Sequence, residues 1–307
     1  MIKFSGIGIA LGEIEEKNDH LEHQFKWPEG KISDKTGINK RYITNDSQST
    51  ESLALEALEN LNNEVSLDKI DFIISVTNTQ TNIFPALAYS IQTNSKFPNA
   101  QFIGLNAGCS GFADALLLAY SGIASKLHKR VLIITSDTYS KFIKDDDQSI
   151  RPLFSDGASA TLIEFNEEGY VLENFISNVA PNTLHHLCMI KDEKRRDYIK
   201  MNGPNVLTFA VGTVLPNLKN IIDPNKKYDL YPHQAGKLVL DTFIKKLGEN
   251  ININTNYAGF GNLVSTSIPN LIKDKSPHLK LEENIIISGF GVGLAHTSLI
   301  LSKNKKR

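Results

Sequence analysis

Cys109 stands in a context that could make it a nucleophile. It lies in the run Asn-Ala-Gly-Cys-Ser-Gly-Phe (residues 106–112), after an apolar stretch and before apolar residues at helical spacing. Backbone N–H groups and the helix dipole at such a strand-to-helix turn favour a thiolate. Gly108 and Gly111 leave room for a substrate beside the sulfur. The alternative is a small buried residue, because unpaired cysteine is among the most buried residue types.

Two later residues could complete a site with this cysteine. His233 lies in Tyr-Pro-His-Gln-Ala-Gly-Lys (residues 231–237), and Asn262 follows a glycine. Papain-like cysteine hydrolases use the same three residue types in the same order, with His as base and Asn orienting it. The chain lacks the Cys-Gly-x-Cys-Trp signature of those hydrolases. Hydrolysis therefore stays an alternative, and a lone His after a strand can also be structural.

Composition excludes several classes of protein. The chain has 307 residues and a formal net charge of -1, so no bulk charge indicates nucleic-acid binding. Its 2 cysteines, Cys109 and Cys188, argue against a disulfide framework and against a cysteine-based metal site. No apolar run is long enough to span a membrane. We expect a soluble cytoplasmic protein.

Short apolar strands alternate with amphipathic helices, which predicts a layered α/β protein. Strands are predicted at residues 70–76, 131–135, 158–165, 228–231, 285–288 and 297–301. One helix should begin near Pro204, and Pro216 should kink or end it. His233 follows the predicted strand 228–231, and Cys109 follows the apolar stretch 102–105, so both are expected just after the end of a strand.

The chain carries a faint internal duplication. Residues 130–137 have a counterpart in 284–289, and the cysteine segment has one in 257–269. Two small-residue turns facing each other across a pseudo-twofold axis would bring Cys109 near Asn262. No linker divides the chain, so the halves 1–166 and 167–307 should pack as one body. Chance similarity between strand-rich segments is the alternative.

Four motifs resemble the β-ketoacyl-acyl-carrier-protein synthases of type III, which are thiolase-like condensing enzymes. They are Asn-Ala-Gly-Cys-Ser-Gly-Phe, Pro-His-Gln-Ala, Gly-Asn-x-x-x-x-Ser-Ile-Pro and Gly-Phe-Gly-x-Gly. The resemblance covers nearly the whole chain, including residues 36–38, 83–85, 154–158 and 201–206. It implies a five-layered αβαβα fold with two pseudo-duplicated halves, and a homodimer.

The resemblance also implies a chemistry that these residues can support. The Cys109 thiolate would attack an acyl thioester, and the backbone N–H groups of Cys109 and Val292 would hold the oxyanion. His233 and Asn262 would donate hydrogen bonds to the carbonyl of a malonyl-type thioester as CO₂ leaves. The carbanion would then attack the acyl-enzyme, as in fatty acid or polyketide biosynthesis. No metal or cofactor is implied, since phosphopantetheine of acyl carrier protein or coenzyme A carries the substrates.

Three alternatives to condensation remain open. An acyltransferase of the same fold could form an ester or amide without decarboxylation. Retention of both His233 and Asn262 favours condensation over that reaction. A non-catalytic binding subunit usually lacks the nucleophile, whereas Cys109 is present. A cysteine hydrolase fits the motif contexts least well.

Other residues are implied to line the substrate site. Phe84 lies in Thr-Asn-Ile-Phe-Pro (residues 81–85), which resembles the family's dimer loop, where this phenylalanine lines the partner's acyl pocket. An ordinary core phenylalanine is the alternative. Phe260, Gly291 and Gly293 are expected at the substrate of their own subunit.

The chain departs from the family pattern at several positions. Gly236 stands where Asn is common, Phe260 where His is common, and Val292 where a third glycine is usual. Lys31 stands where a tryptophan usually stacks on the adenine of coenzyme A, and Gln148 where an arginine usually faces it. We therefore predict a specialised pathway rather than general initiation of fatty acids.

These departures predict a preference for acyl groups on a carrier protein. Carrier proteins present acidic surface, which basic side chains at the tunnel mouth could meet. The candidates are Lys31, Lys35, Lys40 and Arg41. The alternative is that these four charges form an ordinary solvated face.

Overall fold

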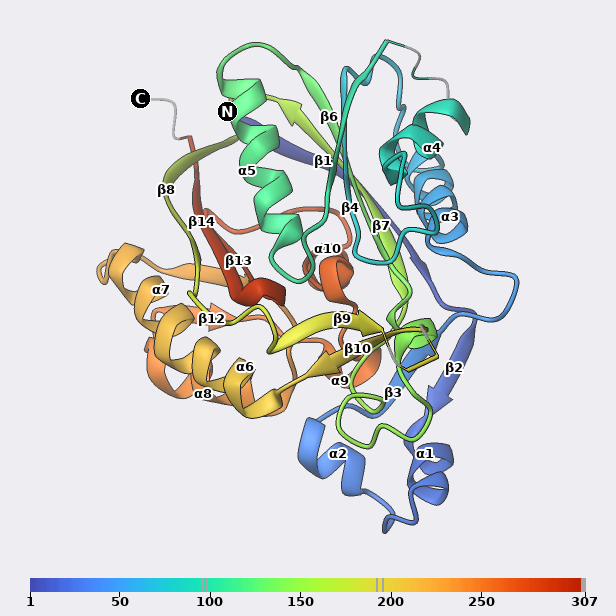
Figure 1. Cartoon of the computed structure of the whole chain (residues 1–307). Helices are drawn as coiled ribbons and strands as arrows, with labels where there is room; N and C mark the ends of the chain where they lie inside the picture. The colour runs from blue at the N-terminus through green and yellow to red at the C-terminus, as the bar shows by residue number, and fades with distance from the viewer. Residues whose placement is uncertain (95–96, 98, 192, 195, 305–307) are drawn as a thin grey trace.

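The first half of the chain forms five strands in the order β1-β7-β6-β4-β5 (Figure 1). Their bounds are β1 Ile2–Leu11, β4 Phe72–Val76, β5 Gln101–Leu105, β6 Arg130–Asp137 and β7 Gly157–Phe165. Helices α3 (Thr50–Asn62) and α4 (Leu87–Asn94) cover one face, and α5 (Gly111–Ala124) covers the other. This computed structural model describes residues 1–94, 97, 99–191, 193–194 and 196–304.

The second half repeats this strand order as β8-β14-β13-β11-β12. Its strands are β8 Tyr170–Val179, β11 Tyr228–Pro232, β12 Ile251–Ile253, β13 Asn284–Gly291 and β14 Ala295–Lys303. β1 and β8 pair only where Ile2 meets Tyr170, which joins the halves into one ten-stranded sheet. The predicted duplication is therefore visible in the strand order, while the boundary at residue 166 stays a prediction.

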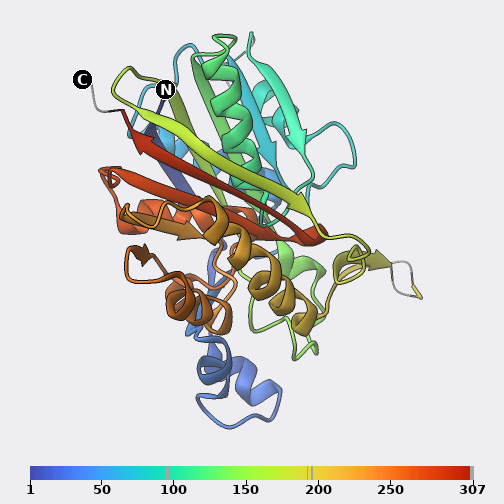
Figure 2. The same ribbon diagram turned by 90° about the vertical axis from the view of Figure 1, so that its left-hand side faces the viewer.

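The elements stack in five layers, as the sequence predicted. α5 and α10 (Ser267–Lys275) lie in the middle layer, since each contacts strands of both halves. α3 and α4 form one outer layer. α6 (Gly203–Phe209), α7 (Leu215–Ile221) and α8 (Lys237–Leu247) form the other, below β8 and β14 in Figure 2. Among the described residues, no helix is both long and apolar enough to cross a membrane.

Smaller elements surround this body. β2 (Ile14–Lys17) pairs with β3 (Lys40–Ile43), and β9 (Leu187–Lys191) pairs with β10 (Asp197–Met201). α1 and α2 project as a small lobe at the bottom of Figures 1 and 2. The remaining helical elements are α1 Asn18–Gln24, α2 Lys31–Thr36, α9 Tyr257–Phe260, η1 Tyr139–Phe142, η2 Ala210–Val214, η3 Val264–Thr266 and η4 Val292–Leu294.

Pro216 interrupts a helix without turning it into a loop. α6 passes into the single π-helical turn of η2, and α7 then starts at Leu215 with Pro216 in its first turn. A proline is tolerated in a first turn because its missing N–H is not needed there. The predicted break at this proline is therefore a change of helical hydrogen bonding.

Candidate active site

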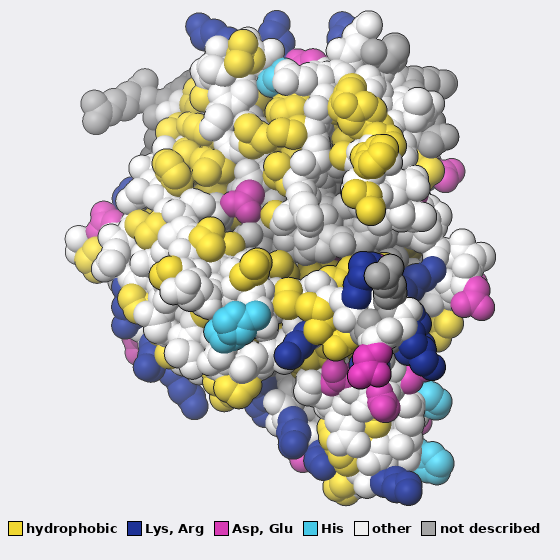
Figure 3. Space-filling model, viewed as in Figure 1, with side chains coloured by type: hydrophobic (Ala, Val, Ile, Leu, Met, Phe, Trp, Pro, Cys, Tyr) yellow, Lys and Arg dark blue, Asp and Glu magenta, His cyan; other side chains and the backbone are white. Residues whose placement is uncertain are grey.

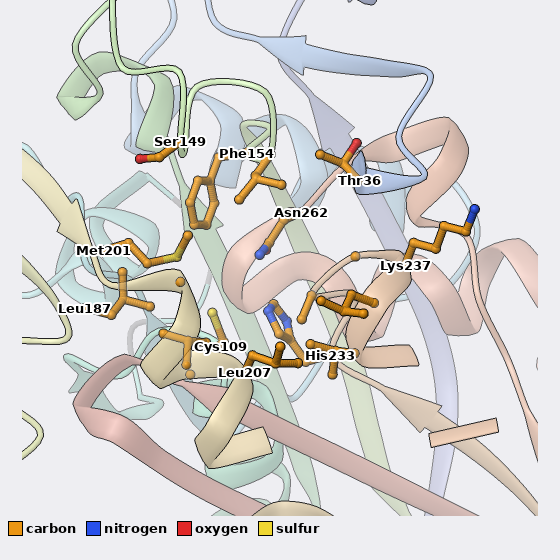
Figure 4. Close-up of a pocket in the computed structure, with 18 of the residues that line it drawn as sticks. Thr36, Cys109, Ser149, Phe154, Leu187, Met201, Leu207, His233, Lys237 and Asn262 are labelled. Atoms are coloured by element: carbon orange, nitrogen blue, oxygen red, sulfur yellow. The ribbon is translucent and has the colours of Figure 1, made fainter. Parts of the chain in front are cut away.

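A cavity of about 590 Å³ opens between the two halves and contains all three predicted catalytic residues. Cys109, His233 and Asn262 reach it from the first half, from the end of β11 and from the turn after α9 (Figure 4). Apolar side chains form most of its wall: Phe154, Leu187, Met201, Val206, Leu207 and Phe290. Polar and charged residues stand at its rim: Lys35, Thr36, Ser149 and Lys237.

Cys109 occupies the turn between β5 and α5, and its side chain is only 2% exposed. The N–H of Gly111 donates to the carbonyl of Gly108 (2.8 Å), which closes the turn. Gly291 from β13 lies directly against the thiol, so that a Cβ there would stand 2.8 Å from Sγ. Glycine is therefore required at this close approach.

The electrostatics of Cys109 differ from the sequence-based expectation of a stabilised thiolate. Burial raises the pKa of Cys109 to about 12, and the nearby Asp137 carboxylate adds to the rise. The backbone N–H groups of Val292 and Cys109 oppose this shift, because both interact with the sulfur. Desolvation outweighs the helix N-terminus here, so the resting residue is a thiol at neutral pH. The same two N–H groups are those that the sequence assigned to the oxyanion.

His233 is held as a neutral imidazole. Its backbone N–H donates to the carbonyl of Ser288 on β13 (2.8 Å), and its ring meets Phe290 edge-on at 5.5 Å between centroids. Burial lowers the pKa of His233 to about 3, and the backbone of Val264 offsets only part of this. A neutral imidazole still carries one N–H, so His233 can act as a hydrogen-bond donor over the physiological pH range.

Asn262 is fixed through its backbone and its side-chain oxygen. Its N–H donates to the carbonyl of Leu153 (2.9 Å), and its carbonyl accepts from the N–H of Ser155 (2.9 Å). Oδ1 accepts from the N–H of Val264 (2.9 Å), so the amide nitrogen is left to face the cavity. Figure 4 shows this nitrogen pointing toward the His233 ring, with the Cys109 sulfur to one side of that ring.

Of the other residues predicted to bind substrate, some line the cavity and some do not. Gly291 lines the cavity, whereas Phe260 and Gly293 are not among its described lining residues. Phe260 instead packs on Tyr42 at 6.0 Å between ring centroids. Phe84 lies outside its own subunit's cavity and is 83% exposed, so it is not a core residue.

The predicted carrier-binding group is only partly exposed, and Arg41 was wrongly included in it. Arg41 is fully buried, where its guanidinium donates to Glu16 (3.2 Å) and Asn18 (2.8 Å). A side chain in that position cannot reach another protein. Lys40 pairs with the exposed Glu15 at 2.8 Å.

Lys31 and Lys35 stand over the ring of Trp27, with ammonium-to-centroid distances of 4.1 and 5.4 Å. The chain therefore has an indole beside Lys35 of the rim, although it stands several residues earlier in the sequence than the resemblance places one. Lys31 covers a face of that ring, and Phe25 lies 5.2 Å from it between centroids.

Sequence reasoning missed Asp137 and Ser265, which lie behind the site. Asp137 ends an apolar strand, and a charged residue directly after a buried strand is a signal that could have been followed. Ser265 lies three residues after Asn262 and has no comparable signal, because a serine in a turn is ordinary.

Comparisons with known proteins agree with this geometry. The 3-oxoacyl-(acyl-carrier-protein) synthase III family matches residues 103–178, and its C-terminal counterpart matches residues 225–303. A β-ketoacyl-(acyl-carrier-protein) synthase III of Streptococcus pneumoniae is 32% identical over 312 residues, covering 95% of this chain and 93% of that protein.

Solved structures match over nearly the whole chain. The 3-oxoacyl-(acyl-carrier-protein) synthase III of Aquifex aeolicus has a TM-score of 0.89 at 26% identity, covering 98% of this chain and 100% of its own. The priming β-ketosynthase of the R1128 polyketide pathway shares the fold, with a TM-score of 0.90 at 22% identity and coverage of 100% and 97%.

Proposed function

The chain belongs to the 3-oxoacyl-(acyl-carrier-protein) synthase III family, as its motifs indicated, and on that premise we propose that it catalyses decarboxylative condensation. The reaction would join an acyl group to a malonyl-type thioester. The observation that carries this proposal is the convergence of Cys109, His233 and Asn262 on one apolar cavity. A thiol supplies the nucleophile, and two neutral donors supply a site for enolate charge.

The first step transfers the acyl group to Cys109. The sulfur attacks the carbonyl carbon of the acyl thioester, and the N–H groups of Cys109 and Val292, which lie against the sulfur, would hold the oxygen as it gains charge. Collapse of the tetrahedral intermediate breaks the bond to the departing sulfur. That sulfur takes up the proton which Cys109 gives up, so no separate base is required for balance. The product is a thioester on Cys109 and a free thiol.

The second step forms the carbon–carbon bond. A malonyl-type thioester loses CO₂, and the electron pair of the broken bond becomes an enolate on the thioester carbonyl. The N–H of His233 and the amide of Asn262 stabilise this oxygen, and donors fixed in advance lower the barrier most. The enolate carbon attacks the acyl-enzyme carbonyl and expels the Cys109 thiolate, which takes up a proton from water.

A homodimer is part of the proposal. β5 is an edge strand of the large sheet, and its apolar residues are partly or largely exposed. Ile83 (92% exposed) and Phe84 (83%) shortly precede α4, which packs against β5. Figure 3 shows apolar side chains gathered over α5 and near α4. An open strand edge with exposed apolar side chains invites pairing with another strand. A second copy joined at β5 would cover this surface and bring Phe84 toward the partner's cavity.

Sedimentation at micromolar concentration tests the dimer. We expect a dimer for the parent and for Phe84→Ala, with the alanine variant altered in its acyl preference. A monomeric parent protein contradicts the crossing of Phe84. Lys280→Ala, an exposed change before β13, serves as the control for handling and purity.

Two measurements test the proposed reaction. Intact-mass analysis after incubation with acyl thioesters should show one acyl group on Cys109. Addition of a malonyl thioester should then release CO₂ and remove the adduct as a 3-oxoacyl product. An adduct without CO₂ release would indicate an acyltransferase that forms an ester or amide. Release of the free acid from the adduct would instead indicate a hydrolase.

A further inference from the structure

Asp137 is a buried carboxylate that none of the reaction steps uses. It ends β6 behind the cavity and is fully buried. Its two oxygens accept hydrogen bonds from different loops. Oδ1 accepts from the N–H of Asn78 (2.8 Å), and Oδ2 accepts from the hydroxyl of Ser265 (2.5 Å). A buried carboxylate is costly unless such bonds satisfy it, so its presence requires a reason.

On one side, Asp137 is connected through Asn78 to the turn that carries the nucleophile. The side chain of Asn78 donates to Oδ1 of Asn106 (2.5 Å) and accepts from the hydroxyl of Tyr139 (3.0 Å). Gly108 packs so closely that a Cβ there would stand 2.6 Å from Oδ1 of Asn78. Asn78 is therefore in contact with the segment directly before Cys109.

On the other side, Asp137 reaches the turn that carries the catalytic amide. Ser265 lies in η3, next to Val264, whose N–H fixes Oδ1 of Asn262. Val264 has a φ of 52°, in the left-handed region that β-branched residues rarely adopt. Such a conformation persists only where its surroundings hold it in place. The hydroxyl and the N–H of Ser265 both donate to the Asp137 carboxylate, and hydrogen bonds to a charged acceptor are among the stronger ones in proteins.

The charge of Asp137 does not help the first step. Its carboxylate is one of the causes that raise the pKa of Cys109, and so it opposes formation of the thiolate. Burial also raises the pKa of Asp137 itself to about 7, against the hydrogen bonds that favour the charged form. Because Asp137 disfavours the thiolate form of Cys109, its role in the site must be a different one. The turn that carries Asn262 is the other part of the site that Asp137 contacts, through Ser265.

We infer that Asp137 is a positioning residue, which holds the Asn262 turn against the Cys109 turn by way of Ser265 and Asn78. The inference rests on the proposed function, because it assigns the decarboxylation geometry to this clamp. Asn262 must present its amide to an enolate oxygen that lies within reach of Cys109. Small displacements of a fixed donor weaken transition-state stabilisation strongly.

A matched pair of serine variants isolates the contact. Ser265→Ala removes the hydroxyl that bonds Asp137, whereas Ser267→Ala removes a buried hydroxyl with no partner among the described residues, two positions along the same segment. We expect Ser265→Ala to lower CO₂ release from a malonyl thioester about tenfold, the scale of a lost bond to a charged group. Acylation of Cys109 should stay within about twofold. Ser267→Ala should leave both rates unchanged.

Asp137→Asn tests the carboxylate itself at pH 8. The amide oxygen can still accept from the N–H of Asn78. The amide nitrogen can donate to the Ser265 hydroxyl, but it can no longer accept from the Ser265 N–H, which lies 3.4 Å from Oδ2 of Asp137. We expect a loss of CO₂ release at least as large as in Ser265→Ala. The double variant should lose little more than Asp137→Asn alone, because both changes act on the same pair of residues.

Crystal structures of the two serine variants give a readout that needs no turnover. The Asn262 amide should be displaced or turned in Ser265→Ala and unmoved in Ser267→Ala. An unmoved amide, equal CO₂ release by the two variants, or an equal fall of acylation and decarboxylation in Ser265→Ala would each overturn the clamp. Failure of the parent to release CO₂ would instead refute the proposed condensation, and the amide positions would still decide the inference.

Discussion

The floor of the cavity and its rim are built in opposite ways. On the floor, Cys109, His233 and Asn262 are 2, 2 and 7% exposed, and backbone hydrogen bonds or close glycines hold the segments that carry them. At the rim, Lys35 and the neighbouring Lys31 stand over Trp27, on the small lobe formed by α1 and α2. The floor is therefore poorly solvated, whereas the rim meets water.

This contrast separates the chemistry from the choice of donor. In the poorly solvated floor, a hydrogen bond to developing charge is strong and an uncompensated charge is costly. His233 and Cys109 are accordingly both neutral at rest. At the rim, water and salt weaken each charge pair, so single lysines contribute little individually. Changes on the floor should therefore affect the rate far more than changes at the rim.

The largest effect is expected from Cys109→Ala, which should abolish the acyl-enzyme. Only a sulfur at this position lies against the N–H groups of Cys109 and Val292. Intact-mass spectrometry after incubation with an acyl thioester measures the adduct. Cys188→Ala is the matched control and should acylate normally, because Cys188 lies on β9 outside the lining of the cavity. Acylation that persists in Cys109→Ala would refute the assignment.

His233→Ala and Asn262→Ala should each lower CO₂ release by about 10²–10³-fold, as is typical for the loss of one donor to an oxyanion. Acylation of Cys109 should fall much less, since its two backbone donors remain. Rapid-quench acylation and CO₂ release from a malonyl thioester separate the two steps. Normal decarboxylation in both variants would contradict the condensing mechanism and favour simple acyl transfer.

The pH dependence of Cys109 alkylation tests whether the floor is desolvated. The pKa of about 12, against 9.0 for an ordinary thiol, reduces the thiolate fraction at neutral pH. We expect alkylation by iodoacetamide at pH 8 to be about 50-fold slower than in the urea-unfolded chain, after allowing for the greater nucleophilicity of a more basic thiolate. The rate should still rise above pH 10. A plateau near pH 9 would show that the helix N-terminus outweighs burial.

Sequence predicted the floor better than its electrostatics or the rim. The motifs around Cys109 and Asn262 were informative because glycines and strand ends fix backbone positions, and the family and the fold were confirmed. The sequence predicted the backbone N–H groups that favour a thiolate at Cys109, but not the burial that raises its pKa, because desolvation depends on packing from distant segments such as β13. Arg41 was misplaced for the same reason, since its partner Glu16 lies on the paired strand β2. The clamp at Asp137 joins residues more than a hundred positions apart, which no local pattern reveals.

The smallest effects are expected at the rim. An indole that stacks on adenine contributes about 1–3 kcal/mol, but here Lys31 lies 4.1 Å from the centre of the Trp27 ring and covers one face. A donor on coenzyme A therefore loses a contact that a donor on a carrier protein never needs. We propose that the carrier protein is preferred, and that its acidic surface meets Lys31 and Lys35.

Lys31→Ala combined with Lys35→Ala tests this preference, with Lys280→Ala as a control at the strand end opposite the cavity. Acylation from the carrier protein should slow about two- to fivefold, which is the scale of two exposed charge pairs. The parent's rate with the carrier should also fall as salt is raised, since rim charges mainly speed association. Acylation from coenzyme A should fall much less.

The opposite result would be a parent protein that acylates as fast from coenzyme A as from the carrier protein, with no effect of salt on the carrier reaction. It would show that these lysines are a solvated face. The difference between floor and rim would then be one of burial alone.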